Sequence, residues 1–514
     1  MADLPEYFFY IHGTNEIIMQ SLKHFIKQFF LSSVLLFAIC HNVSGQLGGV
    51  QQPTFQTFTP VNTTDSYNPN PSNSNQSTYH NDPLEYSRTA RQARIEEQNH
   101  LIRQKGIIEA DEKRKVYEEF LKEEREDEIR KQFQLFREKT KDSKKLQEIA
   151  VLKEKFRIAN PNSPDYISNA RFYFSATQEL QQMLEGKITL DLKRAVFITE
   201  NAWYGNTKSY KTYCNQIDQL VWICREILKQ ENLSEKNASA CHYAIQKLFS
   251  DTLTVKKADG SKKTIYPLEY DFDDFWGNDN YSNLFVSKLL NTKSGQCHSL
   301  PLLYLILANE FKIPAYLAIA PNHSYVKYPI GRTMYSFECT SDNLISDDWV
   351  VASGYISSMA IRTGIYLAPQ TPKETIAECL TDLALGYQQK FGYDDYVRES
   401  AQLVLKYHPS SISAMLTISN CTTAFCFFEA EQLNFPAIEQ IGKYPQFNKR
   451  YHLMLDLEKD IEGSGYIKIP QEEYAKWIKT ADEESQKRKN KQLNQQMASE
   501  IKKDNASSKN ETGK

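Results

Sequence analysis

The chain has 514 residues, of which 41% are hydrophobic and 12% aromatic, and its formal net charge at pH 7 is -3. This length allows two or three domains with a sizeable core, and a mean hydropathy of -0.56 indicates substantial polar flanks. The nearly balanced charge gives no reason to expect a nucleic-acid partner or an anionic membrane surface as partner.

The N-terminal region has the features of a targeting segment. Two lysines precede the apolar run 29–40, which at about a dozen residues is too short for a typical membrane span. Small residues follow at 43–45. We therefore expect a signal peptide over residues 1–45 and an exported protein that is periplasmic, bound to the cell envelope or secreted.

Three alternatives concern this same segment. Met19 would be a more ordinary start than Met1. An uncleaved segment would hold the protein at a membrane, and apart from this case we expect no membrane contact. A lipoprotein modified at Cys40 is disfavoured because Ile39 is a poor residue before a lipidated cysteine.

Two polar regions come next in the chain. Residues 46–84 are rich in Asn, Ser, Thr, Gln and Pro, which is typical of a disordered linker. Residues 85–160 are rich in Arg, Glu, Lys and Gln, with apolar residues at loosely helical spacing, and predict a charged stalk of one or two long exposed helices. The alternative is a coiled coil that oligomerises through residues 85–157, although Gly106 interrupts an irregular heptad.

A domain with a helical first part is predicted between residues 165 and 370. Two prolines at 161 and 164 mark its boundary, and residues 165–252 predict three or four amphipathic helices that are candidates to cover a site. A hairpin is predicted around Gly260, with strands at 253–255 and 264–266. The aromatic and acidic run 270–276 follows, and we expect it to pack aromatic side chains over the domain edge and to wall a cleft.

The residues with the clearest chemistry lie in the second part of this domain. The leucine-rich run 299–311 predicts a buried helix, and Pro301 is tolerated only near its start, so Cys297 should lie at or next to the helix N-terminus. The helix dipole there favours a thiolate. Gly295 would allow a tight turn and leave room for a substrate.

Three strands are predicted after this helix, at 315–320, 323–328 and 334–340. If the hairpin is symmetric about Ile330 and Gly331, His323 and Glu338 are directly opposed on one face, where the carboxylate would orient the imidazole. Cys297, His323 and Glu338 then have the order of a thiol nucleophile, its base and an orienting acid.

These stretches resemble the transglutaminase-like superfamily, which has a papain-like fold, and most of all its branch typified by the N-terminal domain of SirB1-type proteins. The resemblance is carried by residues 281–304, 313–314, 321–324 and 335–340. It implies an α+β core in which a helix bearing the cysteine packs on an antiparallel sheet bearing the histidine and the acid, flanked by helical regions. It also implies the roles of nucleophile for Cys297, base for His323 and orienting acid for Glu338.

Many transglutaminases carry a glutamine on the oxyanion side that has no obvious counterpart here. Asn283 is our candidate for that amide, ahead of Asn278 and Asn280, and the alternative is that it only forms a turn.

The C-terminal region 371–482 predicts successive helices at 374–390, 393–407 and 411–432. Pro409 and the small residues after it resemble a tetratricopeptide-like hairpin, and a simple helical cap is the alternative. The Lys-, Asn- and Gln-rich tail 483–514 is expected to be disordered.

Removal of the signal peptide leaves eight of the nine cysteines, and in an oxidising compartment some of them could pair. No cysteine or histidine spacing is typical of a metal site, so we expect neither a metal nor another cofactor.

The sequence as a whole predicts an exported transglutaminase-like cysteine enzyme that transfers the acyl group of a peptide or amide bond to water or to an amine, with a protein or peptide as substrate. The alternative function is an inactive protein-binding scaffold of the cell envelope.

Overall fold

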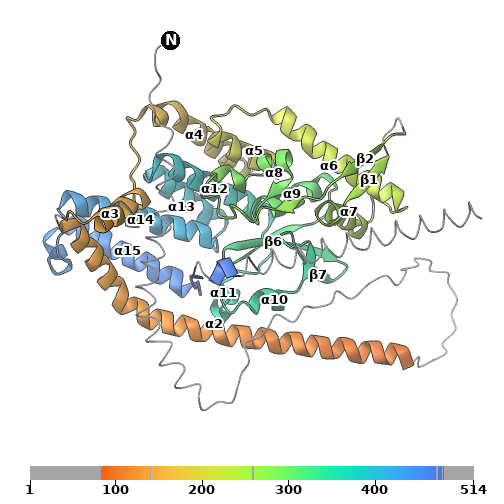
Figure 1. The fold of residues 1–514 in the computed structure, drawn as a ribbon, viewed down its shortest axis with the longest axis horizontal. Helices are drawn as coiled ribbons and strands as arrows, with labels where there is room; N and C mark the ends of the chain where they lie inside the picture. Colours follow the sequence, from red (N-terminus) through yellow and green to blue (C-terminus); the bar gives the residue numbers. More distant parts are fainter. Residues whose placement is uncertain (1–82, 139, 257–259, 471–472, 477–478, 480–514) are drawn as a thin grey trace, which may run out of the picture. The chain divides into compact units, whose positions relative to one another are not determined.

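The computed structural model describes residues 83–138, 140–256, 260–470, 473–476 and 479 (Figure 1). The predicted signal segment, the linker up to residue 82 and the predicted tail at 483–514 lie outside these ranges. The chain divides into two units, residues 1–87 with 140–148 and residues 88–139 with 149–514. The second unit contains the candidate site, and its helices and small sheets give an α+β fold.

Two helices form the region predicted as a stalk, α2 (Pro83–Arg137) and α3 (Ser143–Lys155). The prediction of a fully exposed stalk is wrong at the C-terminal end of α2, where Phe133 is only 1% exposed. Its ring makes edge contacts with Phe427 and Phe435, at 5.4 Å between centroids in each pair. This end of α2 is therefore part of a hydrophobic cluster.

Helix α2 continues through Gly106. A Cβ atom at this position would collide with the backbone carbonyl of Val351, so the glycine permits a close approach of two backbones.

Four amphipathic helices follow, as predicted for residues 165–252. Each begins after a Ser, Asp or Asn whose side chain accepts a hydrogen bond from a backbone N–H of the first turn. They are α4 (Pro164–Leu184), α5 (Leu192–Trp203), α6 (Tyr210–Gln230) and α7 (Ala238–Ser250).

Two small two-stranded sheets precede the sequence around Cys297. The predicted hairpin is formed by β1 (Leu253–Lys256) and β2 (Lys262–Ile265), which pair antiparallel. The second sheet pairs β3 (Glu269–Tyr270) with β4 (Ser294–Gly295) in parallel, and a 3₁₀ helix, η1 (Tyr281–Leu284), and α8 (Val286–Thr292) lie between these strands in sequence.

The predicted buried helix is α9 (Ser299–Glu310), in which residues 299–308 are all buried. A helix that is apolar on every side must be covered on every side, and α9 packs against β5 and β6 of a four-stranded antiparallel sheet (Figure 1). The strands follow one another in chain order: β5 (Tyr316–Ala320), β6 (His323–Ile330), β7 (Thr333–Glu338) and β8 (Asn343–Ile345).

The predicted register of the β6–β7 hairpin is wrong by two residues. The turn consists of Gly331 and Arg332, so Ile330 pairs with Thr333. Gly331 has a φ of +60°, which glycine adopts without steric cost and which suits a two-residue hairpin turn. A shift of two residues keeps every side chain on its predicted face, because side chains alternate along a strand.

The C-terminal helices are α10 (Asp347–Val351), α11 (Ser358–Thr363), α12 (Pro372–Phe391), α13 (Asp395–Tyr407), α14 (Ile412–Gln432), η2 (Ile438–Lys443) and α15 (Pro445–Gly463). The three helices predicted after residue 371 are present as α12, α13 and α14 and agree with the prediction within about two residues at their ends. Helices α10, α11, η2 and α15 had no counterpart in the prediction. The start of α12 is fixed by a capping box between Thr371 and Glu374.

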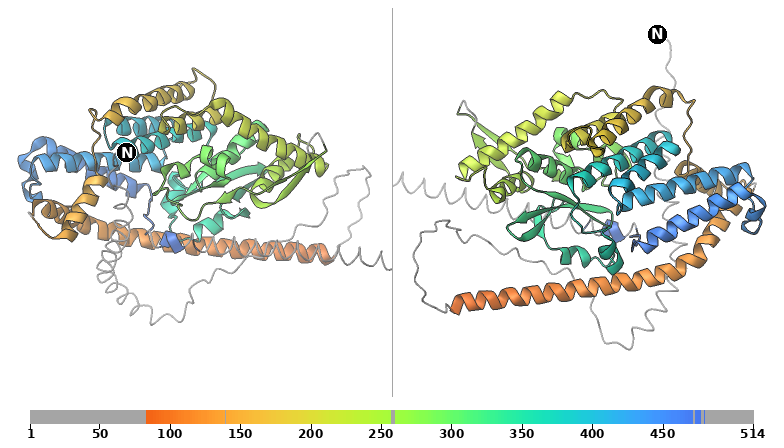
Figure 2. Two further views of the ribbon diagram at one scale, coloured as in Figure 1. Left: turned by 45° about the horizontal axis from the view of Figure 1, so that its top comes forward. Right: turned by 180° about the vertical axis from the view of Figure 1, so that it is seen from behind.

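Helices α12, α13 and α14 pack in succession, as the views in Figure 2 show in teal and blue. Helix α12 also packs on α4 and α5, and residues of all three helices belong to one hydrophobic cluster. The boundary predicted at residue 370 therefore does not separate two cores. None of the helices in the described part of the chain is both long and apolar enough to cross a membrane.

Candidate active site

Cys297 lies two residues before the first residue of α9, next to the helix N-terminus as the sequence predicts. The carbonyl of Gln296 accepts the N–H of Leu300 at 3.0 Å, so the first helical turn already encloses Cys297. The partial positive charge of the helix N-terminus therefore lies next to the thiol, and such a position favours a thiolate. The side chain of Cys297 is partly exposed, as a nucleophile requires.

Gly295 is needed for space rather than for an unusual turn. A Cβ atom there would lie 2.8 Å from Ser299 Oγ and 3.0 Å from a methyl group of Leu289. Ser299 Oγ in turn accepts the N–H of Gln296 at 2.9 Å. The close contact of β4 with the start of α9 thus fixes the backbone on which Cys297 lies.

His323 and Glu338 form a short buried pair. The Nε2 atom of His323 lies 2.6 Å from Glu338 Oε2, and the two residues are 8% and 1% exposed. The other carboxylate oxygen of Glu338 accepts the backbone N–H of Thr340 at 2.8 Å. Because Glu338 binds Nε2, the Nδ1 atom is the ring nitrogen that faces toward other partners.

The thiol of Cys297 and the imidazole of His323 interact electrostatically. Burial alone would raise the pKa of Cys297, but the hydrogen bond with His323 and the charge of His323 outweigh it and lower that pKa below its usual value. Burial would lower the pKa of His323, whereas the charge of Glu338 and hydrogen bonds with Cys297 and Glu338 raise it to about 10. Both directions favour a thiolate–imidazolium pair near neutral pH.

The backbone around the thiol is tied to strand β6. The hydroxyl of Ser324 donates to the carbonyl oxygen of Cys297. The carbonyl oxygen of Asn322 lies 3.9 Å from Cys297 Sγ, and Asn322 has a φ of +55° in the tight β5–β6 turn. Cys297, His323 and Glu338 thus lie on the segment before α9, on β6 and on β7.

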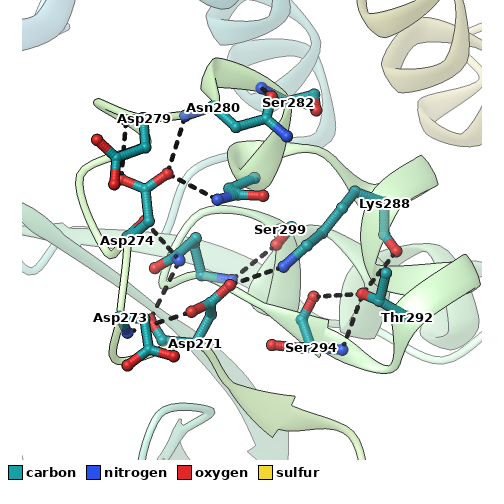
Figure 3. A network of polar contacts seen from close by, with 12 residues as sticks. Asp271, Asp273, Asp274, Asp279, Asn280, Ser282, Lys288, Thr292, Ser294 and Ser299 are labelled. Atoms are coloured by element: carbon teal, nitrogen blue, oxygen red, sulfur yellow. Dashed lines mark hydrogen bonds and ion pairs between the residues drawn. The ribbon is translucent and has the colours of Figure 1, made fainter. Parts of the chain in front are cut away.

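Asn283 has a different set of contacts from the one expected for an oxyanion donor. Its amide nitrogen donates to Asp274 Oδ2 at 2.7 Å, and the same oxygen accepts the N–H of Asn280 at 3.0 Å. Figure 3 shows the carboxylate of Asp274 turned toward Asn280, and Asp271 turned toward Lys288, which it binds at 2.8 Å. These contacts favour the alternative role of Asn283, in which it shapes the loop, and its role in oxyanion binding stays a prediction.

Two tyrosines near the thiol were not anticipated. Tyr270 pairs with Gly295 between β3 and β4 and is 8% exposed, and burial followed by the charge of Cys297 raises its pKa well above the usual value. Tyr474, which is 4% exposed, donates its hydroxyl to the carbonyl of Asn322 at 2.8 Å. The position of Tyr270 in the aromatic and acidic run was the only sequence signal for either residue.

The sequence analysis assigned no role to His298, although this residue directly follows Cys297. It lies 3.1 Å from Asp382 on α12 and 3.0 Å from the carbonyl of Leu284. Burial would lower its pKa, but the charge of Asp382 and these hydrogen bonds raise it to about 9, so His298 carries a positive charge beside the thiol at neutral pH.

The eight cysteines of the described residues are all free thiols. In this part of the chain no group of three or more His, Cys, Asp or Glu side chains is placed to hold a metal ion. Comparisons with protein-family models, curated proteins and solved structures found nothing that matches this chain.

Proposed function

We propose that the protein is a cysteine acyl-transfer enzyme with a transglutaminase-like, papain-like core, and that it acts on a peptide or amide bond. The observation that carries this proposal is the buried 2.6 Å contact between His323 and Glu338, beside a thiol whose pKa His323 lowers. A structural histidine has no need of a thiol on one side and a buried carboxylate on the other. The resemblance to the superfamily gives the same three roles to the same residues.

In the first step, the thiolate of Cys297 attacks the carbonyl carbon of the substrate. Backbone N–H groups at the start of α9, including that of Cys297, would stabilise the negative oxygen of the tetrahedral intermediate. The imidazolium of His323 then gives its proton to the leaving amine, the carbon–nitrogen bond breaks, and a thioester with Cys297 remains. Glu338 holds the ring orientation and stabilises the imidazolium.

In the second step, neutral His323 takes a proton from the acceptor as it attacks the thioester, and Cys297 leaves as the thiolate. With water as acceptor the enzyme is a peptidase or amidase, and with an amine it is a transglutaminase. We favour hydrolysis, because water is always present in the exported setting that the N-terminal sequence suggests.

The second candidate function is a protein-binding scaffold that does no chemistry. One observation favours it: the hydroxyl of Tyr474 hydrogen-bonds Asn322 at the site, where a substrate would have to approach. A reactive thiol separates an enzyme from a scaffold, since a scaffold has no need of one.

The experiment is to measure the rate at which iodoacetamide alkylates Cys297 from pH 5 to 10, with every cysteine followed by mass spectrometry. We expect selective reaction near neutral pH in the wild type. In His323→Ala the rise in rate should move to higher pH, because burial then raises the pKa of the thiol without opposition. His452→Ala, which replaces an exposed histidine on α15, is the matched control.

Reaction of Cys297 at the same rate in His323→Ala and in the wild type would contradict the proposal. So would a Cys297 that stays unreactive in both until the protein unfolds, and the scaffold would then become the better account.

A further inference from the structure

Tyr474 reaches the active site from a part of the chain about 150 residues beyond His323. Residues 473–476 form one helical turn, which begins where the N–H groups of Glu473 and Tyr474 donate to the carbonyl of Pro470 at 3.0 and 3.1 Å. Residues 473, 475 and 476 are exposed, whereas Tyr474 is 4% exposed. A single side chain of this turn is therefore inserted into the molecule.

The inserted phenol shares a hydrogen-bond acceptor with the catalytic thiol. Its hydroxyl donates to Asn322 O at 2.8 Å, and the same oxygen lies 3.9 Å from Cys297 Sγ. Burial, then the charge of Cys297 and a hydrogen bond with it, raise the pKa of Tyr474 above its usual value. Tyr474 is thus a neutral phenol beside the thiol, and both groups approach Asn322 O.

Two aromatic residues hold the ring of Tyr474 from the loop that follows β3. The ring centroid of Trp276 lies 4.8 Å from that of Tyr474, and that of Phe275 lies 6.1 Å away. Both spacings are typical of favourable aromatic contacts. The aromatic and acidic run was expected to wall a cleft, and Tyr474 is the group that lies against this wall.

A reacting carbonyl carbon must come within about 3–3.5 Å of a nucleophile before attack. The phenol of Tyr474 and the thiol of Cys297 meet the same oxygen, Asn322 O, at 2.8 and 3.9 Å, so the phenol lies where part of a substrate would have to be placed. Two features decide which group fits: flat apolar rings on one side and a backbone carbonyl that accepts a hydrogen bond on the other.

We propose that Tyr474 occupies an aromatic substrate subsite beside Cys297, and that a tyrosine-like side chain of a peptide substrate displaces it. This inference rests on the proposed function. Tyr474 acts as an intramolecular mimic of the substrate side chain and covers the thiol. Because it belongs to the same chain, its effective concentration at the site is high. Small reagents should therefore reach the partly exposed Cys297 more slowly while the phenol is in place.

The experiment compares three iodoacetamides on full-length protein: iodoacetamide itself, its N-(4-hydroxyphenethyl) derivative and its N-hexyl derivative. The rate of alkylation of Cys297 is measured in the wild type, Tyr474→Ala, Tyr474→Phe and Tyr266→Ala. Tyr266 is 71% exposed and is the matched tyrosine control.

We expect Tyr474→Ala to raise the rate with iodoacetamide about tenfold and Tyr474→Phe about threefold, because the first loses the ring and the second only a neutral hydrogen bond. In Tyr474→Ala the hydroxyphenethyl reagent should react about tenfold faster than the hexyl reagent, because it refills the aromatic subsite. Tyr266→Ala should equal the wild type.

Unchanged rates in Tyr474→Ala would show that Tyr474 does not cover the thiol, and equal rates for the two derivatives would show that the subsite is not aromatic. Labelling of buried Cys224 in Tyr474→Ala would reveal unfolding. Tyr474→Phe would then decide, and an unchanged rate with iodoacetamide in that variant would overturn the proposal.

The proposed function fails separately from this inference. If His323→Ala leaves the pH dependence of alkylation unchanged even in the Tyr474→Ala background, the thiol–imidazole pair is absent whatever covers it. If that dependence shifts but replacement of Tyr474 has no effect, only the subsite is wrong.

Discussion

His323 and Glu338 meet at 2.6 Å although they do not lie directly opposite each other in the sheet. The pairing of Val326 with Phe337 and of Ile330 with Thr333 sets a register in which Glu338 is displaced from His323 by two residues along β7. Diagonal neighbours of this kind lie on the same face and remain within reach of long side chains. The extra methylene of a glutamate, compared with an aspartate, suits this longer span.

The charge of Glu338 should be needed for the reactivity of Cys297. In Glu338→Gln the oxygen can still accept from Thr340, while the new NH₂ group would donate to Nε2 of His323 and impose the other tautomer. The pKa of His323 should then fall and that of Cys297 should rise. We expect alkylation of Cys297 at pH 7 to slow by about tenfold for each unit by which the thiol pKa rises.

Alkylation kinetics with mapped sites measure this effect. Glu310→Gln is the matched control. Glu310 lies at the C-terminal end of α9, the helix that follows Cys297, and forms a partly exposed ion pair with Lys193. A wild-type rate in Glu338→Gln would contradict an orienting role for the carboxylate.

The decrease in the rate of acyl transfer at high pH should report the deprotonation of His323. Its pKa is raised to about 10, so the imidazolium that protonates a leaving amine is present below that pH and is lost as the pH rises through it. Hydrolysis of an N-acetyltyrosine amide should therefore fall above about pH 10, while hydrolysis of the corresponding p-nitrophenyl ester, whose leaving group needs no proton, should not.

Circular dichroism at each pH checks that the protein stays folded. If both substrates lose activity together while the fold persists, the decrease at high pH does not belong to the acid role of His323.

Most of the secondary structure around the site follows from the sequence, because each element has a strong local signal. The leucine-rich run 299–310 and the β-rich run 316–320 lie within one residue of their predicted limits. The register of the β6–β7 hairpin had no such signal. Registers that differ by two residues bury the same faces, so only the choice of Gly331 and Arg332 as the turn distinguishes them.

The unanticipated features depend on contacts between segments that are distant in sequence. Nothing near Tyr474 distinguishes it from other aromatic residues of a polar helical region, and its role depends on Trp276 and Asn322. From the sequence, the candidates to cover the site were the helices of residues 165–252, not Tyr474. Phe133 likewise looks like one more apolar residue in a charged helix until α14 and α15 pack around it.

The buried carboxyl group of Glu200 should make stability depend on pH. It accepts the N–H groups of Val286 and Ser287 at 2.6 and 2.9 Å, at the start of α8. Burial raises its pKa from 4.5 to about 7, despite these hydrogen bonds. The folded state therefore binds the proton more tightly, and this contribution to stability is present below pH 4.5 and is lost as the pH rises through 7.

The shift corresponds to about 3 kcal/mol in the free energy of unfolding between these limits. We expect the difference in stability between wild type and Glu200→Gln to decrease by that order from pH 4.5 to 7.5, as measured by urea unfolding. Glu179→Gln, at a partly exposed ion pair with Arg194, should show no such trend. A pH-independent difference for Glu200→Gln would mean that the carboxyl is ionised throughout.

Two glycines in helices offer a matched test of how closely α2 packs. Gly106→Ala would place a methyl group against the carbonyl of Val351, and overpacking of this kind typically costs about 1–3 kcal/mol. Gly463 at the end of α15 has no atom within 4 Å of the position of its Cβ. Gly463→Ala should therefore stabilise the protein by up to about 1 kcal/mol through helix propensity alone.

Urea unfolding of both variants measures the contrast. Propensity favours alanine at both positions, so a loss of stability at Gly106 can come only from its contact with the backbone of residues 351–352. If α2 were a solvated stalk, Gly106→Ala would stabilise the protein as much as Gly463→Ala or more. That result would detach α2 from the rest of the unit and restore the long helix as a candidate for pairing with a second copy of the chain.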